Sequence, residues 1–129
     1  MLGLDTSIVV RLIMGEPQPL YAAARRQLES ALEQGTPVVV CDLVIAEAYY
    51  ALQHHYQMPK DEARHALRRF LKSGVVTPHP VAAPDALAAV QGAGVLDRLI
   101  HLRYADLGAV TRTFDAKQSR LKGAVRLKA

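Results

Sequence analysis

Several residue types are scarce in this sequence. It has no tryptophan, only seven other aromatic residues (five Tyr and two Phe) and one cysteine, Cys41. A single cysteine excludes a disulfide within the chain and a metal site built from several thiolates, and it fits a reducing compartment such as the cytoplasm. The low aromatic content argues against a protein that binds nucleic acid mainly by stacking many bases on its side chains.

Long apolar runs and common motifs are also missing. No apolar run approaches the ~20 residues that cross a bilayer, and Asp5 interrupts the apolar start of the chain, which has no basic leader. We therefore expect no membrane segment, no signal peptide and a cytoplasmic location. The sequence contains no P-loop, GxGxxG or HExxH pattern, so it lacks the signatures of common nucleotide sites and zinc proteases.

The composition is that of a folded domain with one basic end. Half of the residues are apolar and 22% are charged, which excludes a disordered chain. A length of 129 residues predicts a single domain, residues 1–129. Residues 112–129 hold six basic side chains against Asp115 alone, whereas the preceding 111 residues carry ten basic and eleven acidic side chains. We expect this basic C-terminal segment to attract a polyanion such as RNA.

Strand and helix patterns alternate along the chain. Short apolar segments that predict strands lie at 2–4, 37–41, 75–77, 108–112 and 123–127. Apolar residues at helical spacing, bounded by Pro, Gly and capping residues, predict helices at 8–14, 20–34, 42–56, 60–73, 84–91 and 95–105. The alternation predicts a three-layer α/β/α sandwich around a mostly parallel central sheet of about five short strands. In such a sheet the functional cleft lies beyond the carboxyl ends of the strands.

Carboxylates recur where that cleft is expected. Asp5, Asp42 and Asp115 each follow a predicted strand. Glu47 and Asp97 interrupt apolar helical stretches, where an unpaired carboxylate is costly unless it binds a cation. We interpret Asp42 as a helix N-cap and the other four as candidate site residues, with caps, turns and ion pairs as the structural alternatives. Oxygen ligands without a cysteine or histidine cluster suit Mg²⁺ or Mn²⁺.

Histidines and the remaining basic residues are weaker candidates. His54 and His55 are adjacent, so on a helix they point about 100° apart and do not chelate together. We interpret His101 as a partly buried structural residue, with a place in the cleft as the alternative. The cations between Arg64 and Lys72 are typical of a solvated helix face, with RNA contact as the alternative.

Four segments resemble, in order and spacing, the motifs of PIN-domain ribonucleases. They are Gly3-Leu-Asp-Thr-Ser7, Leu43-Val-Ile-Ala-Glu47, Leu96-Asp-Arg-Leu-Ile100 and Val110-Thr-Arg-Thr-Phe-Asp115. The length is similar to that of the VapC-like toxins of type II toxin–antitoxin modules. The resemblance implies a PIN-like fold and a Mg²⁺- or Mn²⁺-dependent endoribonuclease. The catalytic acids that it implies are Asp5, Glu47, Asp97 and Asp115, of which the first three are the metal ligands.

The same resemblance implies supporting residues and partners. Thr6, Ser7 and Thr113 are expected to orient carboxylates or water through hydrogen bonds. The candidate phosphate contacts, which flank Asp115 in the sequence, are Arg112, Lys117 and Arg120. Homodimerisation, an RNA substrate and inhibition by a cognate antitoxin protein are also implied.

Two departures from the family pattern leave an alternative open. Gly94 stands where many relatives carry an additional Asp, and Asp115 is followed by Ala116, Lys117 and Gln118 rather than by a further acid. Both departures remove possible metal ligands. The alternative is therefore a catalytically weak or inactive PIN scaffold that binds nucleic acid or a partner protein.

Overall fold

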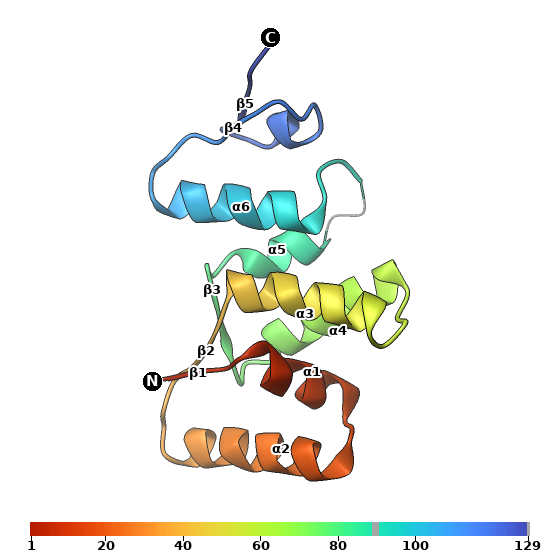
Figure 1. Ribbon diagram of the computed structural model, residues 1–129. Helices are drawn as coiled ribbons and strands as arrows, with labels where there is room; N and C mark the ends of the chain where they lie inside the picture. Colours follow the sequence, from red (N-terminus) through yellow and green to blue (C-terminus); the bar gives the residue numbers. More distant parts are fainter. Residues whose placement is uncertain (89–90, 129) are drawn as a thin grey trace.

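The computed structural model describes residues 1–88 and 91–128 of the chain. Its elements, in chain order, are β1 (Leu2–Gly3), α1 (Thr6–Met14), α2 (Gln18–Glu33), β2 (Val38–Cys41), α3 (Asp42–His54), α4 (Lys60–Leu71), β3 (Thr77–His79), α5 (Ala83–Ala88), α6 (Val95–Asp106), β4 (Arg112–Thr113), the 3₁₀ turn η1 (Gln118–Arg120) and β5 (Val125–Arg126) (Figure 1). The predicted α/β alternation is confirmed. The predicted end of the helix that begins near Pro84 falls partly on residues 89–90, and the basic segment ends at residue 129; these positions lie outside the described residues.

All pairs of strands are parallel, as predicted, but the strands form two sheets. The first has the order β1-β2-β3, with Leu2 opposite Val38 and Val39 opposite Thr77. In the second, β4 pairs with β5, with Arg112 opposite Val125. The single central sheet of about five strands is thus divided into three strands and two, because α6 packs on α3 and α5 and carries β4 and β5 away from β1 (Figure 1).

The core lies around β2 and α3. Val38 and Val40 of β2 are buried, as expected for a parallel strand that is covered on both faces. Ile45 and Leu52, seven residues apart on one face of α3, are fully buried, as is Leu67 of α4. Helices pack against the sheet in an arrangement consistent with three α/β/α layers. Each of these fully buried aliphatic side chains contributes on the order of 2 kcal/mol through burial.

The last part of the chain forms a separate small body on α6. We call residues 109–128, with β4, η1 and β5, the C-terminal unit. The His101 ring joins the unit to α6, since its Nδ1 lies 2.8 Å from Thr111 Oγ1 and its Nε2 lies 2.7 Å from the Lys122 carbonyl oxygen. His101 is therefore a partly buried structural residue, as predicted. In Figure 1 the unit lies beyond α6, at the opposite end of the molecule from α2. None of the helices in the described ranges is long and apolar enough to span a membrane.

Candidate active site

A cavity at the carboxyl end of β1 brings together two of the four predicted acids. Asp5 lies between β1 and α1, and Glu47 lies in the second turn of α3. The cavity, of about 600 Å³, is lined by Asp5, Thr6, Ser7, Val10, Arg11, Glu47, Tyr50, Ala51, His55 and Tyr56. Both carboxylate residues are exposed. The expectation that a cleft lies beyond the carboxyl end of the strand before Asp5 therefore agrees with the structure.

Asp5 is held by its neighbour rather than used as a helix cap. Its backbone has the extended conformation of an N-cap residue, but its side chain makes no capping hydrogen bond to α1. Instead Ser7 Oγ donates to Asp5 Oδ2 at 3.2 Å. No described residue donates a hydrogen bond to Asp5 Oδ1, so this oxygen is available to a ligand in the cavity.

Thr6 contributes a buried hydroxyl that lacks a partner. Thr6 is one of the residues that line the cavity, and its Oγ1 is buried without a hydrogen-bond partner among the residues that the structure describes. A buried, unsatisfied hydroxyl is costly and calls for an explanation, such as a bound water or ion. Two carboxylates beside an orphaned hydroxyl are hard oxygen donors. They fit a hydrated Mg²⁺ or Mn²⁺ ion, which keeps several of its own waters.

The other two predicted acids do not line this cavity. Asp97 is in the first turn of α6, and its main-chain carbonyl accepts a hydrogen bond of 3.3 Å from Gln118 Nε2. Asp115 is in the C-terminal unit, where its Oδ1 accepts a hydrogen bond of 2.7 Å from the Gln118 backbone N–H. In the ranges 1–88 and 91–128, no group of three His, Cys, Asp or Glu side chains is placed to hold a metal ion. The expected convergence of all four acids is therefore not found within one chain, because β4 does not join the sheet that holds β1.

Thr113 and Gln118 form the turn that surrounds Asp115. Thr113 Oγ1 donates to Gln118 Oε1 at 3.0 Å and accepts from the Asp115 backbone N–H at 3.0 Å. Thr113 thus orients the turn and not a carboxylate in the cavity. Gln118 is 8% exposed and connects the unit to α6. No sequence signal points to this role, since a single glutamine in a polar segment has no distinguishing pattern.

A comparison with protein families gives a match whose residue range includes all four predicted acids. The model of the PIN domain matches residues 3–123. The chain belongs to the PIN domain family. PIN domains are typically metal-dependent nucleases, and membership therefore indicates a hydrolase that acts on nucleic acid. The comparison with curated proteins finds no match.

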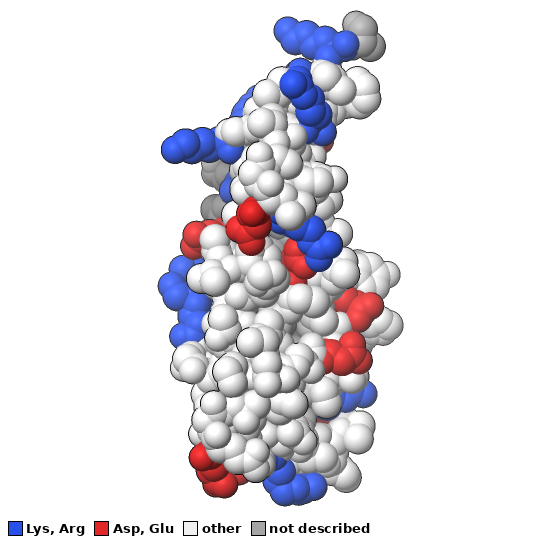
Figure 2. Space-filling model, turned by 90° about the vertical axis from the view of Figure 1, so that its left-hand side faces the viewer, with Lys and Arg blue, Asp and Glu red and all other residues white. Residues whose placement is uncertain are grey.

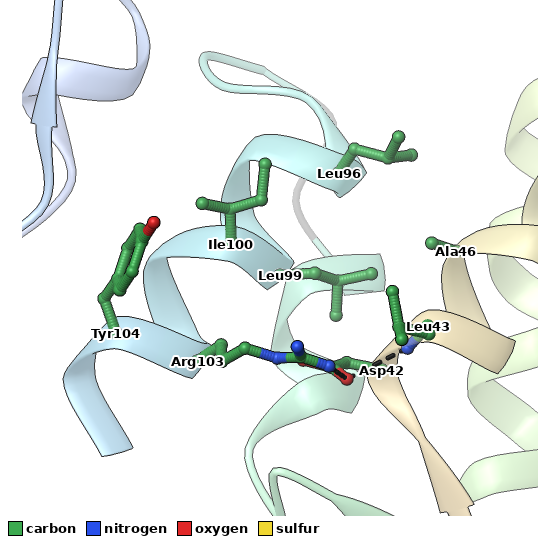
Figure 3. A pocket seen from close by; sticks show the side chains of 8 residues that line it. All are labelled: Asp42, Leu43, Ala46, Leu96, Leu99, Ile100, Arg103 and Tyr104. Carbon is green, nitrogen blue, oxygen red and sulfur yellow. Dashed lines mark hydrogen bonds and ion pairs between the residues drawn. The ribbon is translucent and has the colours of Figure 1, made fainter. Parts of the chain in front are cut away.

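A second cavity of this PIN domain lies between α3 and α6 (Figure 3). Its wall holds an ion pair in which Arg103 Nε donates to Asp42 Oδ2 at 2.7 Å and the Arg103 guanidinium also contacts Oδ1. Hydrogen bonds from Arg103 lower the pKa of Asp42, and burial offsets this only in part. Asp42 is the first residue of α3, and its Oδ1 accepts from the Leu43 N–H, so the expected N-cap is corrected to Cys41. The remaining wall is mainly apolar, with Leu43, Ala46, Leu96, Leu99, Ile100 and Tyr104.

Several arginines differ in their surroundings from the sequence-based expectation. An ion pair is the structural alternative for Asp97, but neither nearby arginine on α6 forms one with it: Arg103 pairs with Asp42, and Arg98 donates to main-chain carbonyls of residues 91 and 93. Arg64 is buried and pairs with Asp61, so it does not belong to a solvated face. The other three cations of that face, Arg68, Arg69 and Lys72, line a groove on α4 together with His65 and Ser73.

The candidate phosphate contacts lie on the C-terminal unit. Arg112, Lys117 and Arg120 are exposed, and no described side chain forms an ion pair with any of them. Figure 2 shows Lys and Arg side chains projecting from this end of the molecule, whereas on the same face of the body scattered acidic and basic side chains interrupt an otherwise uncharged surface. Arg11, which the sequence did not single out, brings a further positive charge to the wall of the cavity that holds Asp5 and Glu47.

Proposed function

We propose that this chain is a Mg²⁺- or Mn²⁺-dependent endoribonuclease. The observation that carries the proposal is the meeting of Asp5, Glu47 and Thr6 in the lining of one cavity at the carboxyl end of β1, where the buried Thr6 hydroxyl has no partner among the described residues. Membership of the PIN family supports the nuclease chemistry.

The residues of the cavity have distinct tasks in this proposal. Asp5 and Glu47 hold the cation through their carboxylate oxygens, and Ser7 fixes the orientation of Asp5 through the hydrogen bond to Oδ2. The Thr6 hydroxyl, which has no partner among the described residues, would be an additional oxygen donor beside a bound cation. When bound, the cation lowers the pKa of a water and offsets charge on the phosphate under attack. Arg11 adds positive charge that favours a phosphodiester in the cavity.

Asp97 and Asp115 are proposed as the further acids of the site. Asp97 belongs to α6 and Asp115 belongs to the C-terminal unit. Their contribution to the site therefore depends on where α6 and that unit lie relative to the β1 edge. Arg112, Lys117 and Arg120 are proposed to contact the RNA backbone, since the unit carries most of the chain's excess positive charge.

The proposal includes the biological setting implied by the motifs. The chain acts in the cytoplasm as a single PIN domain, as the toxin of a toxin–antitoxin pair, and forms a homodimer that a cognate antitoxin inhibits. The support is the order and spacing of the four motifs over residues 3–115. Co-expression with the product of an adjacent small reading frame tests this setting: survival of cells only in its presence is the expected result.

The proposed activity is tested with purified protein and a labelled RNA. Cleavage should require Mg²⁺ or Mn²⁺, stop on chelation, and fall by at least ~10²-fold in Asp5→Asn and Glu47→Gln. Glu33→Gln and Asp85→Asn are matched controls, because both acids are exposed on helices away from the cavity. Unchanged cleavage by both site variants would refute the assignment.

One observation favours a second candidate, a PIN scaffold that binds nucleic acid or a partner without hydrolysing it. The described residues of a single chain bring only two of the four acids together. This candidate predicts RNA binding that persists in Asp5→Asn and no cleavage with either cation.

A further inference from the structure

We infer that the active site is shared between two copies of the chain. The C-terminal unit of one copy extends the three-stranded sheet of a second copy, with β4 lying parallel to β1, and this brings Asp115 to Asp5 and Glu47. The catalytic part of this inference rests on the proposed function, whereas the exchange of strands does not.

The first sheet has one protected edge and one unprotected edge. β3 carries Pro78, and Pro80 follows directly after it, and proline blocks the addition of a further strand. The other edge, β1, has neither proline nor a charged side chain in residues 1–4. Gly3 is exposed, and a Cβ placed on it would meet no atom within 4 Å. The β1 edge is therefore open to a strand from another chain.

The second sheet is incomplete by itself. Parallel strands normally occur in sheets that are covered on both faces, yet here only two short parallel strands pair with each other. Val110, Phe114, Val125 and Leu127 beside or within these strands are 41–68% exposed. One edge of β4 pairs with β5, and its other edge has no strand partner among the described residues. The unit thus offers a strand with an unpaired edge, which is what the β1 edge lacks.

The geometry of a single chain keeps the unit away from its own β1. His101 and Gln118 attach the unit to α6 through three hydrogen bonds. The ion pair between Arg103 and Asp42 in turn attaches α6 to the start of α3. As a result the unit lies on the far side of α3 and α5 from β1 (Figure 1). A second copy related by a twofold axis can supply the missing strand, and the exchange is then reciprocal.

Charge also favours this occupant. The last 18 residues carry a net charge of +5, whereas the rest of the chain carries −1, and the receiving edge presents Asp5 and Glu47. In parallel strands that lie side by side, the carboxyl ends meet at one edge of the sheet. Asp115 follows β4 as Asp5 follows β1, so the exchange places a third carboxylate at the cavity and basic side chains around it.

A mixed-dimer experiment tests the shared site. Asp5→Asn and Asp115→Asn chains with different affinity tags are co-expressed, and heterodimers are purified through both tags. Exchange puts both substitutions in one site and leaves the other intact, so the heterodimer should recover about half of wild-type RNA cleavage while each homodimer stays inactive. A heterodimer as inactive as its parents, beside an active wild type, would overturn the inference.

A cross-linking experiment tests the exchange without relying on activity. In a Cys41→Ser background, differently tagged Gly3→Cys and Arg112→Cys chains are mixed and treated with a short bis-maleimide. Neighbouring strands lie about 4.8 Å apart, so exchange predicts a covalent heterodimer that neither chain forms alone. Cross-linking without any RNA cleavage by the wild type refutes the proposed function and retains the exchange. Absence of the heterodimer, or cross-linking only within a chain that carries both cysteines, refutes the exchange.

Discussion

Replacing Thr6 by Val should make the protein more stable without metal and less active with Mg²⁺ or Mn²⁺. Thr6 is 9% exposed, and its Oγ1 is buried without a partner among the described residues. Val has the same branched shape, so the substitution removes an unsatisfied hydroxyl with little change in packing. An unpaired buried polar group costs about 1–3 kcal/mol, and we expect the free energy of unfolding to rise by roughly 1–2 kcal/mol.

That magnitude translates into a measurable change in melting temperature. Unfolding entropy of about 2.1 cal/mol/K per residue, over 129 residues, corresponds to about 4 °C for each kcal/mol. We therefore expect Thr6→Val to melt roughly 4–8 °C above the wild type in the presence of a chelator. Added Mn²⁺ should raise the melting temperature of the wild type more than that of the variant, because the variant lacks the hydroxyl proposed as an oxygen donor beside the cation.

Thr111→Val is the matched control for this substitution. Thr111 is 2% exposed, but its Oγ1 has a partner, the His101 ring, at 2.8 Å. Loss of that hydrogen bond should lower the free energy of unfolding by about 1–2 kcal/mol. Both variants are followed by thermal and urea unfolding and by RNA cleavage. If Thr6→Val is less stable than the wild type without metal, the hydroxyl has a partner in the folded protein and the argument from its isolation is wrong.

Three further predictions concern the Asp42–Arg103 pair, the attachment of the C-terminal unit and RNA binding. Because Arg103 lowers the folded-state pKa of Asp42, the carboxylate stabilises the fold above its unfolded pKa of about 3.9, and this is lost as the pH falls through the folded pKa. Arg103→Met should flatten that acid dependence in urea unfolding, and an identical pH profile would contradict the assignment. His101→Ala should speed amide hydrogen exchange in the C-terminal unit but not in β2, and equal protection in the two proteins would show that the ring is not the attachment. Arg112→Ala should weaken RNA binding and reduce the slope of log affinity against log salt by about 1, whereas Arg26→Ala on α2 should leave both unchanged.

The helices and the class of fold could be predicted because local signals determine them. The fully buried residues Ile45 and Leu52 keep helical spacing, the Val38–Val40 run marks a buried strand, and Gly15 closes α1 in the left-handed conformation at φ 72°. Each of these features is encoded within a few neighbouring residues. Glu47 and Asp5 could be placed at one cavity for a related reason, since both follow from where a strand ends and a helix begins.

The pairing of the shorter strands could not be predicted. β1, β4 and β5 each contain two residues, too few for a hydrophobic pattern to specify a partner strand. The position of Asp115 depends on that pairing. For this reason the sequence could not predict that Asp115 lies away from Asp5 and Glu47 within one chain. The Asp42–Arg103 ion pair joins residues 61 positions apart, and no local spacing points to it.

The most direct test of the central claim is the dependence of RNA cleavage on Mn²⁺ concentration in the wild type, Glu47→Gln and Glu33→Gln. If the cavity of Asp5 and Glu47 holds the catalytic cation, the wild type and Glu33→Gln should respond alike to Mn²⁺. Glu47→Gln should need more Mn²⁺ and reach a rate lower by at least ~10²-fold. Identical curves for all three proteins would contradict the account.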